Sequence, residues 1–204
     1  MSSRGTAVLL VLAASLGCGG GTTEQVATEA EDGEEGWRTV ELASLDVEQQ
    51  KQLDRAAAAK DLLASTLMGA LTEELEVGGP AGAVDICRDM APMISAQTAE
   101  ESGVKIGRTS YRLRNPENRP PAWAEGLVER RVEGPTTLVG PNGELAVWSP
   151  IRLAAPCLAC HGDPETIEPA VQNAIAEEYP DDQAVGFAEG DLRGWFWVEV
   201  PAES

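Results

Sequence analysis

Histidine is almost absent from this chain of 204 residues, in which His161 is the only one. A Ser/His/Asp catalytic set needs an imidazole that is free to carry protons between nucleophile and substrate. His161 directly follows a pair of closely spaced cysteines, so it already belongs to another motif. We therefore expect no hydrolytic catalysis, and no enzymatic activity of another kind is visible.

Positive charge is also scarce. The chain has 15 Lys and Arg against 34 Asp and Glu, a formal net charge of −19. A field of this sign repels the phosphates of nucleic acid and of anionic lipid headgroups. We expect no nucleic-acid partner. A basic partner protein is compatible with the charge, although an acidic, solvated surface is common without one.

No hydrophobic run is long enough to span a bilayer. The longest lies at residues 7–16, preceded by Arg4, and is about half of the roughly 20 residues that a spanning helix needs. A charged start and a short apolar run predict an export signal over residues 1–17. Gly17 before Cys18 is typical of a lipoprotein signal, in which Cys18 is lipidated. Ordinary secretion, without a lipid, is the alternative.

Residues 18–36 are rich in Gly, Thr, Ala and acidic side chains, so we expect a flexible tether. The folded domain is then residues 37–204. Export implies an oxidising compartment, and we expect the periplasmic side of a membrane. Gly19, in place of aspartate after Cys18, favours the outer membrane.

The folded domain has helical patterns first and strand patterns later. Residues 47–76 and 81–102 predict two long helices, and 122–132 and 164–179 two shorter ones. Strands are expected at 104–113, 136–139, 144–153, 185–188 and 195–200, with a hairpin turn at 140–143. This order predicts an α+β fold with a small antiparallel sheet.

The sequence Cys157-Leu158-Ala159-Cys160-His161 carries the chemistry. Two thiols three residues apart, followed by histidine, form the attachment signature of c-type haem. Cys157 and Cys160 would bind the porphyrin through thioether bonds, and His161 would bind the iron. Because no second histidine exists, the other axial position falls to Cys87, Met68, Met90, Met93, a lysine or no protein ligand. Thiolate binds ferric iron strongly, which makes Cys87 the leading candidate.

Four motifs together resemble a family of bacterial and cyanobacterial haem c domains with a PAS-like fold, once classed as a domain of unknown function and also found as a sensory domain. They are Val84-Asp85-Ile86-Cys87, Gly107-Arg108-Thr109-Ser110, Arg114-Asn115-Pro116-Glu117-Asn118 and Cys157-Leu158-Ala159-Cys160-His161-Gly162. The resemblance covers residues 45–201. It implies a PAS-like antiparallel sheet and one covalent haem with Cys87 and His161 as axial ligands.

Four arginines, at positions 108, 112, 114 and 119, are notable in so acidic a chain. Haem carries two propionates, and a guanidinium group pairs well with a carboxylate. Arg108 is our first choice for this contact, and ordinary salt bridging is the alternative. The tryptophans at 123, 148, 195 and 197 either line the porphyrin or fill the core.

These observations predict a membrane-tethered monohaem c-type protein for electron transfer or for redox or gas sensing, with a partner protein or a diatomic ligand. Two alternatives use the same residues. Cys87, Cys157, Cys160 and His161 form a Cys₃His set for structural zinc, and Cys157 with Cys160 would suit thiol redox chemistry.

Overall fold

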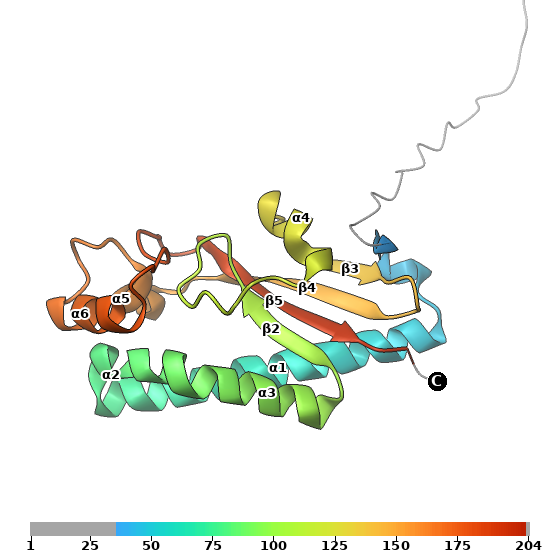
Figure 1. Cartoon of the computed structure of the whole chain (residues 1–204). Helices are drawn as coiled ribbons and strands as arrows, with labels where there is room; N and C mark the ends of the chain where they lie inside the picture. Colours follow the sequence, from blue (N-terminus) through green and yellow to red (C-terminus); the bar gives the residue numbers. More distant parts are fainter. Residues whose placement is uncertain (1–35, 203–204) are drawn as a thin grey trace, which may run out of the picture.

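A five-stranded antiparallel sheet forms the centre of the molecule in the computed structural model, which describes residues 36–202 (Figure 1). The strand order is β1-β3-β4-β5-β2. The strands are β1 (Arg38–Thr39), β2 (Lys105–Thr109), β3 (Thr136–Val139), β4 (Leu145–Arg152) and β5 (Leu192–Val200). The predicted α+β class and antiparallel sheet are confirmed. The predicted signal 1–17 and Cys18 lie outside the described residues.

Helix α1 (Val47–Val77) covers one face of the sheet. It begins at a capping box, in which the backbone N–H of Gln49 donates to Asp46 Oδ1 at 2.8 Å and the N–H of Asp46 donates to Gln49 Oε1 at 3.0 Å. These bonds satisfy amides that have no partner within the helix. Its buried stripe, including Leu63 and Leu67, packs against β2 and β5 in the larger apolar cluster.

A second long helical stretch runs antiparallel to α1 and contains a wide turn. It comprises α2 (Gly79–Asp85), a π-helical turn η3 (Ile86–Met90) and α3 (Ala91–Ser102). The N–H of Ala91 donates to Ile86 O, five residues back. Pro92 accounts for the wide turn, because its ring clashes with the carbonyl four residues earlier and it lacks an N–H. The extent of the predicted helix 81–102 is correct, and the π turn was not predicted.

The predicted hairpin is confirmed. Strands β3 and β4 pair around residues 140–143, and Gly143 has φ 84°, a left-handed conformation that suits glycine. The predicted strand 104–113 is too long, since β2 ends at Thr109. There Ser110 Oγ donates to Arg193 O at 2.6 Å and accepts from the N–H of Arg112 at 3.0 Å, which turns the chain out of the sheet.

The predicted strand 185–188 is wrong. This segment lies beside the cysteine motif, where the N–H of Gly186 donates to Gly162 O at 2.6 Å and that of Phe187 to His161 O at 3.0 Å. The predicted strand 195–200 is confirmed, but β5 starts three residues earlier, at Leu192. The predicted helices 122–132 and 164–179 are shorter than expected: the first is η4 (Ala122–Ala124) followed by α4 (Glu125–Glu129), and the second is α6 (Pro169–Glu178).

The other face of the sheet packs on a tryptophan-rich cluster under α4. The rings of Trp148 and Trp195 stack with centroids 4.8 Å apart, and Trp123 meets Trp148 edge to face. Short helices η5 (Ala155–Cys157) and α5 (Leu158–His161), with α6, lie at the end of the sheet near α2 (Figure 1). A short turn η2 (Leu42–Ser44) precedes α1. None of the helices in residues 36–202 is both long and apolar enough for a membrane span.

Candidate functional site

A cavity of about 240 Å³ lies where α1, the π turn, the end of β2 and the cysteine motif meet. Its wall is mostly apolar and includes Leu67, Leu71, Val84, Leu153 and Phe196. Five residues predicted for the site line it together: Cys87, Arg108, Cys157, Cys160 and His161. Three of them come from one motif, and the other two lie 49 or more positions earlier in the sequence.

The motif forms a compact helical turn after β4. Pro156 starts η5, and α5 continues from Leu158 to His161, so both thiols lie on one short stretch of backbone. Neither sulfur is in a disulfide, and each residue is half-buried. Cys160 Sγ lies 3.9 Å from Pro80 O, which places the motif against α2. Burial raises the pKa of the Cys160 thiol.

The His161 imidazole is oriented by a short hydrogen bond. Its Nδ1 lies 2.6 Å from Ala184 O, which requires that Nδ1 carry the proton. Burial, together with the charges of Arg114 and Arg193, lowers the pKa of His161 to about 3. The imidazole is therefore neutral at pH 7 with a lone pair on Nε2. A neutral ring fixed by a carbonyl on its other nitrogen is the usual form of a metal-binding histidine.

Cys87 lies in the π turn. Its side chain borders the main cavity and also a second one of about 180 Å³, which is lined by polar residues that include Asn115, Glu117 and Arg119. Single π turns within helices occur frequently at functional sites. The π turn therefore contains the same cysteine that the shortage of histidine made the leading candidate for an axial ligand.

Two arginines at the cavity lack an anionic partner. The Arg108 side chain has no hydrogen bond or ion pair with any described residue, and burial lowers its pKa. Arg193 also lines the cavity; burial lowers its pKa to about 10, and its Nε has no partner in the described part of the chain. Sequence reasoning missed Arg193. Its signal was a basic residue in the otherwise apolar start of β5.

Two further polar groups at the cavity have no hydrogen-bond partner among the described residues. They are Thr109 Oγ1 and Tyr179 Oη, both buried. Buried polar atoms without partners are uncommon in folded proteins and call for an explanation such as a bound group. Together with Arg108 and Arg193, they indicate a cavity built for a ligand that is mainly apolar and carries anionic substituents.

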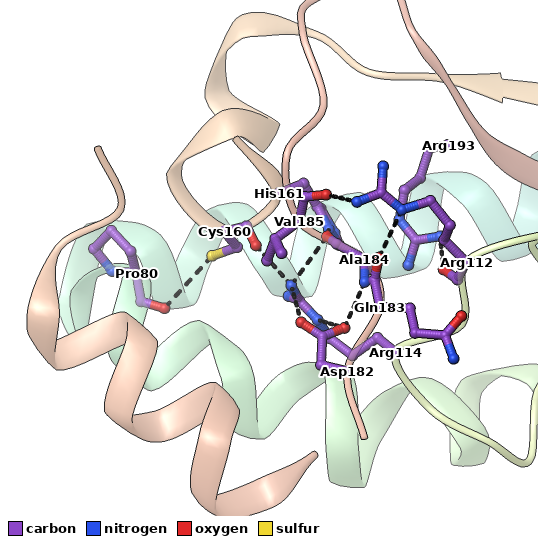
Figure 2. A network of polar contacts seen from close by, with 10 residues as sticks. All are labelled: Pro80, Arg112, Arg114, Cys160, His161, Asp182, Gln183, Ala184, Val185 and Arg193. Atoms are coloured by element: carbon purple, nitrogen blue, oxygen red, sulfur yellow. Dashed lines mark hydrogen bonds and ion pairs between the residues drawn. The ribbon is translucent and has the colours of Figure 1, made fainter. Parts of the chain in front are cut away.

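Arg114 also lines the main cavity, but its guanidinium group, like that of Arg112, is hydrogen-bonded to backbone carbonyls. Both groups donate to carbonyls of the segment 183–185, which runs past the motif (Figure 2). Arg112 Nε binds Gln183 O at 2.8 Å, and its Nη2 binds Val185 O. Arg114 pairs with Asp182 at 3.1 Å and donates to Cys160 O at 2.6 Å. Of the four arginines in the predicted cluster, Arg119 borders only the second cavity.

The tryptophans do not line the main cavity. Trp123, Trp148 and Trp195 belong to the core cluster on the opposite face of the sheet, and Trp197 borders only the second cavity. The core interpretation is therefore correct for the first three.

The two alternative chemistries receive no geometric support. In residues 36–202 no three His, Cys, Asp or Glu side chains are grouped so that they could hold one metal ion. A Cys₃His zinc site requires four such ligands around a tetrahedral centre. Burial raises the pKa of the Cys160 thiol, which disfavours the reactive thiolate at that position.

Comparison with known proteins found a similar solved structure and a matching protein family. No curated protein matches the chain. A solved structure, described as the cyanobacterial heme-protein Tll0287, is similar with a TM-score of 0.57 and 26% sequence identity, over 76% of this chain and 97% of the other. The model of the Tll0287-like family matches residues 25–201, which include every residue of the cavity. The chain therefore belongs to the Tll0287-like family.

Proposed function

We propose that this chain is a monohaem c-type protein. Cys157 and Cys160 would bind the porphyrin covalently, and His161 would supply the proximal ligand to the iron. The observation that carries the proposal is the cavity itself. It brings the attachment motif, Cys87 and an unpaired Arg108 together from distant parts of the sequence. The heme-protein described above provides independent support.

The residues present fit a haem. A porphyrin is flat and apolar with two carboxylates at one edge, and the cavity offers apolar walls with two guanidinium groups that lack anionic partners. Arg108 and Arg193 would pair with the propionates, because arginine offers several donors in a rigid fork. Burial of an unpaired cation is costly, and the propionates would remove that cost.

Cys87 is the proposed distal ligand. It borders the same cavity as His161, and thiolate is a strong donor to ferric iron. Met68 also borders the cavity, whereas Met90 and Met93 do not, and all three methionines are exposed. A thiolate ligand and a net charge of −19 both stabilise ferric iron. We therefore expect a low reduction potential.

The proposed role is electron transfer, or redox or gas sensing, without catalysis. In this proposal the chain is exported, is lipidated at Cys18 and faces the periplasm, with the outer membrane favoured. Its partner would be a basic redox protein or a small diatomic molecule. Sensing requires a distal ligand that can leave, and reduction weakens the bond between iron and thiolate.

The test is the spectrum of protein made in a host that attaches haem c. The pyridine haemochrome should show one haem c per chain, and none when Cys157 and Cys160 are both replaced by alanine. Cys87→Ala should change the ferric spectrum, and Met68→Ala should leave it as in the wild type. An unchanged spectrum in Cys87→Ala refutes distal ligation by Cys87. Porphyrin that is absent from the wild type refutes the proposal as a whole.

Binding of carbon monoxide separates gas sensing from the other proposed roles. If the protein is a gas sensor, the dithionite-reduced wild type should bind carbon monoxide, with a shift of the Soret band. A ferrous form that remains unchanged after long exposure to the gas would refute gas sensing and leave electron transfer or redox sensing as the role.

A further inference from the structure

The carbonyl that orients His161 is shared with a buried ion pair. Ala184 O accepts from His161 Nδ1 at 2.6 Å and from Arg114 Nη2 at 3.3 Å. The same guanidinium nitrogen donates to Cys160 O at 2.6 Å (Figure 2). Arg114 therefore contacts the backbone of the motif and the hydrogen-bond partner of its imidazole.

Asp182 completes the arrangement. Its carboxylate pairs with Arg114 at 3.1 and 3.2 Å, and its Oδ1 accepts from the N–H of Ala184 at 2.8 Å. Arg114 and Asp182 are each only 8% exposed. Ala184 is thus held at its N–H by Asp182 and at its carbonyl by Arg114.

The two charges act on the imidazole with opposite signs. A guanidinium on Ala184 O withdraws electron density from the acceptor of the Nδ1 proton, so the ring becomes a weaker electron donor through Nε2. Its positive charge also disfavours the extra charge of ferric iron. Asp182 offsets both effects. Hydrogen-bond partners behind a ligating histidine are known to tune ligand basicity and metal properties, and the low local dielectric strengthens charge effects at buried sites.

We propose that Arg114 and Asp182 are positioning residues that set the donor strength of His161 toward the iron, with Arg114 raising the reduction potential and Asp182 lowering it. This inference rests on the proposed haem. Neither residue would be a ligand of the iron; both would act through Ala184 and through the electrostatic field of their charges.

The test compares reduction potentials of two charge-removing variants. Arg114→Gln should shift the ratio of ferric to ferrous protein at a fixed ambient potential about tenfold toward ferric, which lowers the potential by about 59 mV for one electron. Asp182→Asn should shift the ratio by a similar factor toward ferrous. If the two residues had only a structural role, the two variants would not shift this ratio in opposite directions.

Arg152 and Glu133 provide matched controls. They form an exposed ion pair, at 2.8 Å and with exposures of 45% and 69%, so the same changes of net charge can be made at side chains that do not line the cavity. Arg152→Gln and Glu133→Gln should shift the ratio less than a third as far as their buried counterparts. Shifts of the same sign in both buried variants, or shifts no larger than those of the controls, overturn the inference.

Removing one member of a buried pair is destabilising, so folding is checked first by circular dichroism. Asp182→Asn is isosteric and keeps an acceptor for the Ala184 N–H. If one single variant does not fold, the direction in which the other variant shifts the ratio of ferric to ferrous protein still tests the inference. If neither folds, the double variant R114Q/D182N decides: its potential should lie within the range of the controls, and a tenfold shift refutes the inference. Wild type without covalent haem would instead refute the proposed function.

Discussion

The side chains around the cavity are positioned by partners far away in the sequence. Ser110 Oγ binds Arg193 O across 83 positions, and Cys160 Sγ approaches Pro80 O across 80. Such contacts require close approach of the backbones that carry them. Gly194 shows this most clearly, because a Cβ there would lie 2.2 Å from Thr109 O in the neighbouring strand.

Gly194→Ala should therefore destabilise the protein. The clash involves a backbone oxygen at the end of the adjacent edge strand β2, and overpacking of this kind costs about 1–3 kcal/mol or more. Urea unfolding should show a midpoint well below that of the wild type.

Gly69→Ala is the matched control. Gly69 is exposed within α1, and a Cβ there would meet nothing within 4 Å. Alanine is the better helix former by about 0.5–1 kcal/mol, so this variant should gain stability. An equal response of the two variants would contradict the account of Gly194.

At the scale of the elements, α1 depends on its first turn. Asp46→Ala removes the side-chain acceptor of the capping box and should lower the free energy of unfolding by about 1 kcal/mol. Asp46→Asn keeps a capping oxygen and should stay within a few tenths of the wild type. Both are measured by urea denaturation, and a loss as large in the asparagine variant would show that charge, rather than capping, matters.

Elements with local signals were predictable from the sequence. The composition of residues 47–76 indicated α1, and Gly140-Pro141-Asn142-Gly143 indicated the hairpin. The segment 185–188 was not predictable, because its amides pair with His161 and Gly162 rather than with a strand. The π turn had a visible cause in Pro92, but a proline also occurs in the first turn of ordinary helices.

Those parts of the candidate site that depend on a short motif or on residue composition were predictable from the sequence. The motif at 157–161 carries its own spacing, and Cys87 followed from the shortage of histidine. Arg193 and Asp182 had no such signal. Their places depend on the pairing of β5 with β2 and on the segment that passes the motif, which are contacts of long range.

At the scale of the whole molecule, the dominant property is its charge of −19. Repulsion among carboxylates opposes compactness, and salt screens it. Raising NaCl from 0.01 to about 0.15 M should therefore raise the thermal midpoint, and a gain of 1 kcal/mol corresponds to about 2–4 °C for a domain of this size. KCl at equal ionic strength should act alike. A midpoint that falls or does not change would show that repulsion contributes little.

The two ends of the sheet differ in what they carry. Strand β1 and the C-terminal end of β5 lie at one end, and α5 and α6 lie at the other (Figure 1). Leu67, on the cavity wall, is 20 residues further along α1 than Val47, a distance of about 30 Å at 1.5 Å per residue. The N-terminus could be attached to a surface by a lipid on Cys18, or by a tag on an electrode. Either attachment would hold the molecule at the end remote from the cavity. The cavity end would then remain accessible to a partner protein.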